Sequence, residues 1–257
     1  MLTPPEIARS LLAAGESKAR LPFGKMLLLA ILAGAYIALA GVGATAAAVT
    51  VESGSLAKLL SACVFPAGLS VVILAGSELF TGNCLMVMAL LERRITPAQL
   101  LRNWLTVYLG NAMGGAAVAA LAVYSHTASL FGDGLARSMV SIAESKAALG
   151  AGDAFLRGVL CNFLVCLAVW MAAASKRAEG KVIALFFPIL LFVLCGYEHC
   201  IANLYYLPAG AFAAAEYGME TTLTLAGCLK NLAAVTLGNL VGGAALGVGY
   251  RFAYLKE

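Results

Sequence analysis

Long apolar runs separated by short charged segments dominate the chain and predict six membrane-crossing regions. The first run, residues 26–51, holds no charged side chain. As a helix it is long enough to cross about 30 Å of hydrocarbon, because each helical residue adds ~1.5 Å. Similar runs follow at residues 59–91, 104–124, 156–174, 182–211 and 232–250. The pattern therefore predicts an all-α integral membrane protein with six transmembrane helices.

The second and fifth runs are interrupted, and we expect a broken helix in each. Residues 59–91 are too long for one straight crossing and carry Gly76 and Gly82 around a single charged residue, Glu78. The fifth run places Glu198 and His199 next to each other in apolar surroundings. Ionisable side chains are costly in hydrocarbon and usually mark functional sites. We therefore predict that the two breaks contribute to one site.

The two breaks also repeat each other. The pattern Gly-x-Glu-x-x-x-x-Asn occurs at residues 76–83 and again, 120 residues later, at 196–203. A second pattern, Leu-Gly-Asn-x-x-Gly-Gly, occurs at 109–115 and 237–243. Both pair the second region with the fifth and the third with the sixth, and repeats of three spans each must insert in opposite senses. This is the inverted-repeat plan, in which paired broken helices mark a transport site.

The spans divide the chain into an N-terminal part, a six-helix part and a short end. Residues 1–25 are either an amphipathic helix on the membrane surface or a solvated leader, and the apolar run beyond Ala40 argues against a cleaved signal peptide. The longest polar connection is predicted at 125–153. The predicted boundaries are 1–25, then 26–252 with repeat one at 26–124 and repeat two at 155–252, then 253–257.

The distribution of basic residues predicts the orientation. With the N-terminus inside, 12 of the 17 Lys and Arg residues lie in the inner segments and 5 in the outer ones. Because cytoplasmic segments carry the excess of Lys and Arg, we expect both termini in the cytoplasm.

Composition narrows the class further. The chain is 62% hydrophobic and 12% charged, with a mean hydropathy of +0.92, whereas soluble domains are about a quarter charged. The net charge of +4 comes from scattered basic residues, so it is no nucleic-acid signature. Most of the seven cysteines lie in apolar runs without a Cys-x-x-Cys pair, which indicates buried thiols rather than disulfides or metal ligands. We expect no metal and no cofactor.

The breaks suggest a chemistry for the site. A half-helix N-terminus at mid-bilayer favours an anion, and Thr81 in the first break adds a hydroxyl donor. His199 in the second break is a donor that can also become cationic: burial disfavours the charged form, while Glu198 or a passing anion favours it. Leu79 and Phe80 suggest an apolar constriction that rejects a bare ion. We infer that a weak-acid anion takes up a proton at or near His199 and crosses part of the path neutral.

Plainer interpretations stand beside these. A lone buried histidine usually packs helices together, but a position in a repeated, glycine-flanked break favours the functional role. Glu78 is expected to satisfy backbone donors at its break. Asn111 and Asn239 are interpreted as hydrogen-bonding links between helices. Lys146 is most simply a solvated surface lysine, although it can also draw anions towards a mouth.

The motifs Glu-Leu-Phe-Thr at 78–81 and Gly-Tyr-Glu-His-Cys-Ile-Ala-Asn at 196–203 closely resemble those of the formate/nitrite transporter family. The stretches 103–111, 162–171 and 235–239 extend the likeness over essentially the whole chain. The resemblance implies an aquaporin-like protomer with its own pore, a homopentamer in the cytoplasmic (inner) membrane, and no catalysed covalent chemistry. It implies transport of formate, nitrite or hydrosulfide.

The resemblance also carries roles to particular residues. Thr81 resembles the pore-loop threonine of the family, and His199, next to Glu198, resembles the central histidine. Asn162 matches a pore asparagine, and Lys146 matches the basic residue of the outer vestibule. Lys18 is more loosely similar to a lysine near the inner mouth. Phe65, Leu69 and Leu79, beside Phe80, look like one constriction, and Val165 and Phe192 like the other.

The motifs leave the anion open, and two other classes of protein compete. Residues 94–100 and 254–257 are nearer the formate channels and 75–82 nearer the nitrite channels, while Cys200 does not decide between these and a hydrosulfide channel. We expect formate. A membrane enzyme using Glu198 and His199 as an acid–base pair would need a nucleophile or metal that the sequence does not supply. A neutral-solute channel of the aquaporin type would need Asn-Pro-Ala, which neither break contains.

Overall fold

A computed structural model describes residues 1–255 of the chain, and every regular element in this part is helical. Lys256 and Glu257, which end the predicted segment 253–257, lie outside the described residues. The helices in chain order are α1 (Pro4–Ala19), α2 (Phe23–Ala48), α3 (Gly54–Val64), α4 (Pro66–Ala75), α5 (Phe80–Asn83), η1 (Cys84–Met86), α6 (Val87–Leu91), α7 (Pro97–Tyr124), η2 (Thr127–Ser129), α8 (Gly134–Ala148), α9 (Ala151–Ala173), α10 (Ala178–Leu194), α11 (Cys200–Glu216) and α12 (Leu225–Tyr254).

Five of the helical segments are long and apolar enough to cross a membrane. They are 23–48, 54–75, 97–124, 151–173 and 225–254. The predicted fifth region instead consists of α10 and α11, which are 17 residues each and separated by residues 195–199. The chain thus has the helices of a multi-pass membrane protein, and four of its six apolar runs coincide with a single long helix each, α2, α7, α9 and α12.

Two helix pairs, α2 with α7 and α9 with α12, make the most extensive contacts. Small residues allow this approach: a Cβ on Gly114 of α7 would overlap the carbonyl oxygen of Ile31, and one on Gly242 of α12 would overlap that of Val159. Both glycines belong to the repeated Leu-Gly-Asn-x-x-Gly-Gly motif, and the absence of a side chain lets the two helix backbones approach closely.

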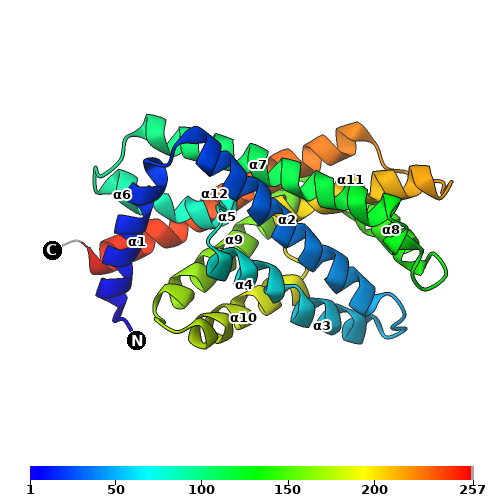
Figure 1. Ribbon diagram of the computed structural model, residues 1–257, viewed down its shortest axis with the longest axis horizontal. Helices are drawn as coiled ribbons and strands as arrows, with labels where there is room; N and C mark the ends of the chain where they lie inside the picture. The colour runs from blue at the N-terminus through cyan, green and yellow to red at the C-terminus, as the bar shows by residue number, and fades with distance from the viewer. Residues whose placement is uncertain (256–257) are drawn as a thin grey trace.

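The terminal helix α1 lies at one end of the long axis, and α8 lies at the other (Figure 1). Helix α1 is not a freely solvated leader, because Ile7, Ala8, Gly15 and Ala19 are buried and the helix packs on α6, η1, α9 and α12. Helix α8 lies inside the segment 125–153, which the sequence described only as the longest polar connection. Its buried face packs on α11.

Candidate functional site

Both helix breaks turn at a glycine with left-handed backbone. Helix α4 ends at Ala75, Gly76 follows with φ +78°, and helix resumes at Phe80. Helix α10 ends at Leu194, Gly196 has φ +70°, and α11 starts at Cys200. Glycine, which has no Cβ, adopts such φ values at no steric cost, and this explains why the repeated motif begins with it.

One asparagine from a neighbouring helix holds each break. Asn239 of α12 donates from Nδ2 to the carbonyl oxygens of Gly158 (2.8 Å) and Glu198 (2.9 Å), and its Oδ1 accepts from the Cys200 N–H (2.9 Å). Asn239 was predicted to link helices, and it does so while also satisfying backbone groups that the break leaves unpaired.

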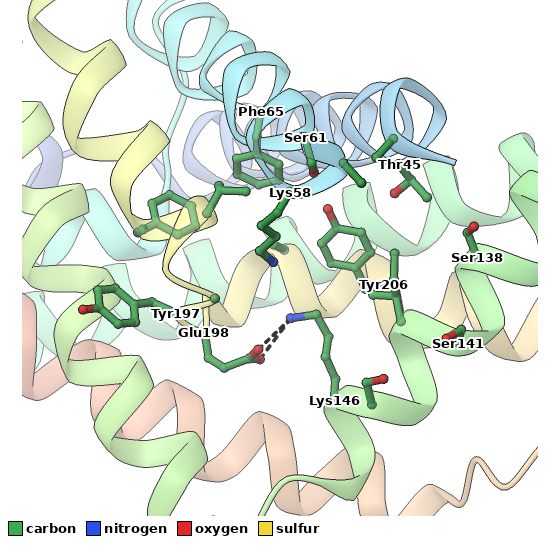
Figure 2. A pocket seen from close by; sticks show the side chains of 18 of the residues that line it. Thr45, Lys58, Ser61, Phe65, Ser138, Ser141, Lys146, Tyr197, Glu198 and Tyr206 are labelled. Atoms are coloured by element: carbon green, nitrogen blue, oxygen red, sulfur yellow. Dashed lines mark hydrogen bonds and ion pairs between the residues drawn. The ribbon is translucent and has the colours of Figure 1, made fainter. Parts of the chain in front are cut away.

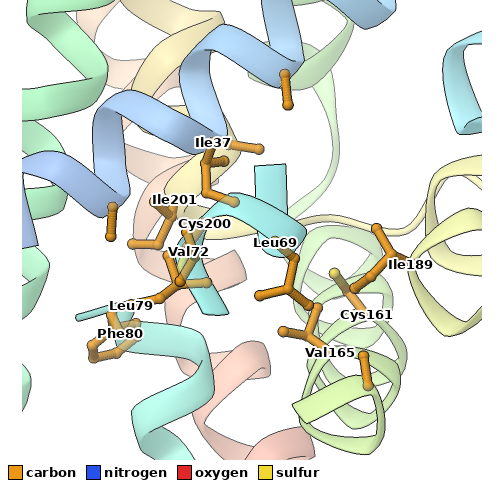
Figure 3. Close-up of a cluster of buried hydrophobic side chains, with 14 of the residues drawn as sticks. Ile37, Leu69, Val72, Leu79, Phe80, Cys161, Val165, Ile189, Cys200 and Ile201 are labelled. Atoms are coloured by element: carbon orange, nitrogen blue, oxygen red, sulfur yellow. The ribbon is translucent and has the colours of Figure 1, made fainter. Parts of the chain in front are cut away.

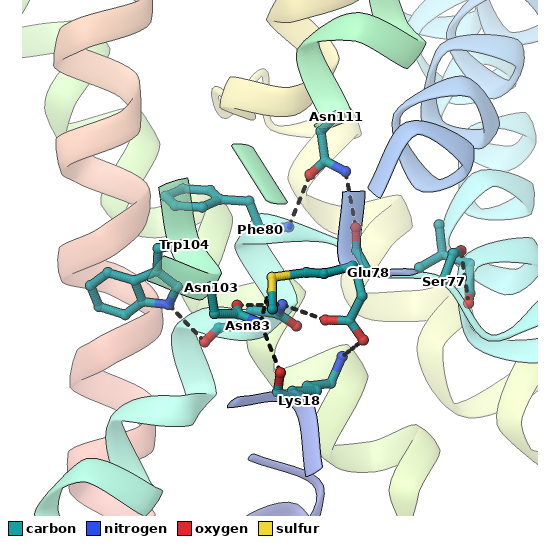
Figure 4. A network of polar contacts seen from close by, with 10 residues as sticks. Lys18, Ser77, Glu78, Phe80, Asn83, Asn103, Trp104 and Asn111 are labelled. Atoms are coloured by element: carbon teal, nitrogen blue, oxygen red, sulfur yellow. Dashed lines mark hydrogen bonds and ion pairs between the residues drawn. The ribbon is translucent and has the colours of Figure 1, made fainter. Parts of the chain in front are cut away.

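Asn111 of α7 repeats this arrangement at the first break. Its Nδ2 donates to the carbonyl oxygens of Ala30 (2.7 Å) and Glu78 (2.9 Å), and its Oδ1 accepts from the Phe80 N–H (3.0 Å) (Figure 4).

Glu198 is buried and ion-paired with Lys146 of α8. The Lys146 ammonium lies 2.9 Å and 3.0 Å from the two carboxylate oxygens (Figure 2), and Asn203 donates to Glu198 Oε2 at 2.7 Å. Asn203 also donates to Asn231, which in turn donates to the Lys146 carbonyl oxygen. Lys146 is therefore not a solvated surface lysine, since only 15% of its side chain is exposed.

Glu78 has the same set of partners at the other end of the molecule. Lys18 of α1 contacts Glu78 Oε1 at 2.7 Å, and Asn83 donates to Glu78 Oε2 at 2.7 Å and to Asn103 at 2.9 Å (Figure 4). The prediction that Glu78 satisfies backbone donors is wrong, because its carboxylate accepts hydrogen bonds from the side chains of Lys18 and Asn83. Lys18 and Lys146 are 128 residues apart, and so are Asn103 and Asn231. This is the spacing of the repeated Leu-Gly-Asn-x-x-Gly-Gly motif, so the sequence could have identified both pairs.

The two breaks meet at Thr81 and His199, whose side chains lie 3.0 Å apart, Oγ1 to Nε2. The N–H of Ala202 donates to His199 Nδ1 at 3.1 Å, so Nδ1 is an acceptor and the ring proton of the neutral imidazole is on Nε2. His199 therefore donates to Thr81, and the Thr81 hydroxyl keeps its own proton for another acceptor. Asn162 Nδ2 donates to the carbonyl oxygens of Thr81 (3.3 Å) and Asn239 (2.7 Å), which joins the pair to the scaffold.

Two cavities approach this buried pair. The Lys146 cavity, about 580 Å³, is lined by Lys146, Glu198, Phe65 and Phe192 among others. The Lys18 cavity, about 320 Å³, is lined by Lys18, Glu78, Leu69 and Leu79 among others. Thr81 is fully buried and His199 is 3% exposed, and the residues that line the two cavities include neither of them.

Four of the predicted constriction residues line the cavities, Phe65 and Phe192 in the Lys146 cavity and Leu69 and Leu79 in the Lys18 cavity. Phe65 packs edge-to-face on Phe192 at 5.6 Å between ring centroids, and Phe192 stacks on His199 at 5.8 Å. Phe65 thus accompanies Phe192, whereas the sequence grouped it with Leu69 and Leu79. Leu69 and Val165 belong to the same buried cluster and lie near each other in Figure 3.

Phe80 does not line either cavity, in contrast to Phe65, Leu69, Leu79 and Phe192. Its ring packs edge-to-face on Trp104 and Tyr108, at 6.4 Å and 5.1 Å between centroids. Phe80 is the first residue of α5 and its side chain is directed towards α7, whereas the neighbouring Leu79 lines the Lys18 cavity.

The same site includes residues that the sequence did not single out. Lys58, Arg157, Ser61 and Tyr206 line the Lys146 cavity, and the Lys146 ammonium lies 5.3 Å from the centre of the Tyr206 ring. Within residues 1–255, no three His, Cys, Asp or Glu side chains converge as metal ligands would. What the arrangement provides is hydrogen-bond donors and cations for an anion.

Comparisons with known proteins agree with this chemistry. Residues 5–253 match the family model described as Formate/nitrite transporter. A probable formate transporter of Methanothermobacter thermautotrophicus is 38% identical, covering 99% of this chain and 98% of the relative. The formate channel FocA of Haemophilus influenzae is also 38% identical, covering 86% of this chain and 84% of the relative.

Two solved structures have the same fold. One, described as an FNT family ion channel, is 32% identical with a TM-score of 0.86 and covers 96% of this chain and 98% of its own. The other, a pentameric formate channel with formate bound, is 33% identical with a TM-score of 0.81 and covers 91% of this chain and 98% of its own.

Proposed function

The chain belongs to the formate/nitrite transporter family, which is one of channels and transporters rather than enzymes, and we propose that it conducts small monovalent weak-acid anions, formate first among them. The observation that carries this proposal is that two cavities, each with a lysine, approach one buried donor pair, Thr81 and His199, from opposite sides. A pathway built in this way offers an anion attraction at both mouths and hydrogen bonds at its centre.

The transmembrane topology that we propose has six spans in an inverted repeat, giving an aquaporin-like protomer. Helices α3 to α6 form the second span and α10 with α11 the fifth, each broken at its glycine. The contacts of Asn111 and Glu78 recur at Asn239 and Glu198, which supports the two-repeat arrangement. The excess of Lys and Arg on the α1 side favours the cytoplasmic (inner) membrane with both termini in the cytoplasm. The Lys146 cavity then opens to the outside and the Lys18 cavity to the cytoplasm.

The assembly that we propose is a homopentamer with one pore in each protomer. The similar formate channel is described as pentameric. Large apolar side chains such as Leu109, Leu121 and Leu237 are exposed on the outer faces of the helices, where lipid and neighbouring subunits would cover them.

The anion crosses with the help of a proton. It enters a cavity, loses water at an apolar constriction and meets the Thr81 hydroxyl and the His199 Nε2–H. The constrictions are Phe65 with Phe192 outside and Leu69, Leu79 and Val165 inside. While Nδ1 of His199 accepts from Ala202, the ring is neutral and donates a hydrogen bond rather than a proton, so the proton arrives from cavity water near His199. The protonated acid passes the apolar segment without the cost of a buried charge.

Formate is preferred over nitrite and hydrosulfide because the relatives named above are described as formate transporters or channels. The pathway sorts by size and protonation, and all three anions are small conjugate bases of weak acids. Nitrite or hydrosulfide therefore remains the alternative substrate within the same function.

Side-by-side flux of formate, nitrite and hydrosulfide into liposomes across pH tests the proposal. We expect formate to enter faster than through empty liposomes, and faster at lower pH, where proton uptake is easier. His199→Asn should reduce this flux, and His126→Asn, the same change at an exposed histidine with φ +61°, should leave it unchanged, because Asn tolerates that backbone. Absence of flux for all three anions would overturn the proposal. Turnover of a covalent substrate in detergent would favour a membrane enzyme, and water or glycerol permeation alone a neutral-solute channel.

A further inference from the structure

The two cavities carry unequal charge. Lys58, Lys146 and Arg157 line the Lys146 cavity together with a single carboxylate, Glu198. The Lys18 cavity is lined by one lysine and one carboxylate, Glu78. Two positive charges are therefore in excess at one mouth, and none at the other.

The excess charges are those of Lys58 and Arg157. Lys146 is neutralised by Glu198 at 2.9 Å, whereas the ion pairs within residues 1–255 include neither Lys58 nor Arg157. Cations without a protein partner in a lined cavity are available to a soluble anion.

The two cations come from different helices that flank the second break. Lys58 is on α3 one turn before Ser61, so the ammonium and the hydroxyl share a helix face that lines the cavity. Figure 2 shows the Lys58 side chain pointing into the cavity towards the Lys146–Glu198 pair. Arg157 is on α9, and its carbonyl oxygen accepts from the Glu198 N–H at 3.3 Å, which fixes the base of this side chain at the break.

Neither cation belongs to the duplicated scaffold. The position 128 residues before Arg157 is Leu29, and the position 120 residues after Lys58 is Ala178. The lysine–glutamate–asparagine network recurs in both halves, but this pair of cations occurs in one half alone. The first break forms without such a pair of cations, so Lys58 and Arg157 are not needed to form a helix break.

We propose that Lys58 and Arg157 form an anion subsite in the Lys146 cavity, which holds the carboxylate of a small monocarboxylate before it reaches Phe65 and Phe192. The subsite rests on the proposed function and makes the two mouths kinetically unequal. Substrate supplied to the Lys146 side half-saturates transport at a lower concentration than substrate supplied to the Lys18 side. The overall equilibrium across the membrane is unaffected.

The expected size follows from Coulomb's law. A unit charge about 7–10 Å from the anion in a wet cavity, at an effective dielectric constant of about 40–80, changes its local concentration about two- to sevenfold at low salt. Because the screening length is only about 10 Å at 0.1 M salt and ~3 Å at 1 M, the difference between the two mouths should shrink at high ionic strength.

The test measures the concentration dependence of initial formate flux in right-side-out and inverted membrane vesicles. Lys58→Met and Arg157→Met should each raise the half-saturating concentration about threefold from the Lys146 side and the double variant about tenfold, at low salt. The maximal rate from the Lys146 side should rise by the same factor, because passive transport requires an equal ratio of maximal rate to half-saturating concentration from the two sides. The half-saturating concentration and the maximal rate from the Lys18 side should not change. Lys58→Arg and Arg157→Lys should restore the parent values because they retain the charge.

Lys230→Met is the matched control. Lys230 is an exposed cation that lines a separate groove with Glu144 and Thr222, so its loss should leave half-saturation unchanged. Lys58 and Arg157 variants with the parent half-saturation from both sides would overturn the subsite while the proposed function stands. An equal shift in Lys230→Met would also overturn it, because surface charge in general would then be responsible. A parent protein that passes none of the three anions would instead overturn the proposed function.

Discussion

The two helix breaks have nearly the same scaffold and different chemistry. In each break an asparagine contacts two carbonyl oxygens and one N–H, and a glutamate binds one lysine and one asparagine. The scaffold residues Lys18, Glu78, Asn83, Asn103 and Asn111 correspond to Lys146, Glu198, Asn203, Asn231 and Asn239.

The difference lies in the residues that face the centre. His199 corresponds to Leu79 in the other break, and Thr81 corresponds to Ile201. Each break therefore supplies one polar group and one apolar group, and the 3.0 Å contact of Thr81 with His199 joins the two polar ones. The duplicated residues hold the backbone open, and the residues that depart from the duplication determine what the pathway can bind.

Removing the asparagine anchors should have the largest effect and should be similar in both breaks. Asn111→Ala leaves the Glu78 carbonyl and the Phe80 N–H without this partner, and Asn239→Ala leaves the Glu198 carbonyl and the Cys200 N–H, at about 1–3 kcal/mol for each buried group that finds no water. We expect each variant to lose about 3 kcal/mol or more of unfolding free energy, measured by loss of helical circular dichroism during denaturation in detergent.

The matched controls are Leu109→Ala and Leu237→Ala, which truncate exposed side chains on the same two helices and should have small effects. A large loss in one asparagine variant and none in the other would contradict the equivalence of the two scaffolds.

The sequence predicted the scaffold well because its signals are local. The glycines at 76 and 196 and the carboxylates two residues later stand out in apolar runs. It missed α8 because this helix of 15 residues alternates buried apolar with polar side chains and so has no long apolar run. The offset of 128 residues between Lys18 and Lys146 would have identified α8 as the counterpart of α1. The unequal charge of the cavities needed the structure, since Lys58 and Arg157 are 99 residues apart in sequence.

Making the two breaks chemically alike should have the next largest effect. His199→Leu places leucine at both equivalent positions and removes the Nε2–H donor. Formate flux should fall about ten- to a hundredfold, because one buried hydrogen bond to a charged group contributes about 1.5–3 kcal/mol. Ile201→Leu, a change of similar volume at the counterpart of Thr81, should retain most of the flux in the same liposome assay.

The two lysine–glutamate pairs should differ in their contribution to stability. The exposed fractions of the lysine side chains are 15% for Lys146 and 30% for Lys18. Solvent screens the second pair more strongly, so Lys18→Met should cost about 1 kcal/mol or less and Lys146→Met about 2–4 kcal/mol. Denaturation in detergent at low and high salt measures both. A larger loss in Lys18→Met would contradict this ranking.

The smallest effect concerns Glu144 on α8, whose counterpart on α1 is Glu16. Hydrogen bonds from the Thr222 N–H and the Thr221 hydroxyl lower the pKa of Glu144 below its usual value. A carboxyl with a lowered pKa in the folded state contributes stability above its unfolded pKa and loses it as pH falls through the folded pKa. Hydrogen-exchange protection of residues 219–224 should therefore decrease as pH falls from about 6 to about 3.

Two substitutions, one at Glu144 and one at Glu16, test the origin of this pH dependence. Glu144→Gln should make the protection independent of pH in this range, because the amide does not titrate. Glu16 lies 3.8 Å from both Arg20 and Arg94, which is a weak contact. Glu16→Gln should therefore barely change the hydrogen-exchange protection of the segment around Arg94. A pH-dependent Glu144→Gln variant would show that another group is responsible.

The central claim is that Thr81 and His199, one from each break, act as a single donor unit. A double-mutant cycle of Thr81→Val and His199→Leu in the formate flux assay tests it most directly. If the two act as one unit, the double variant should transport about as slowly as the slower single variant. If instead the two reductions in flux multiply, the residues act independently and the account of a shared central site is wrong.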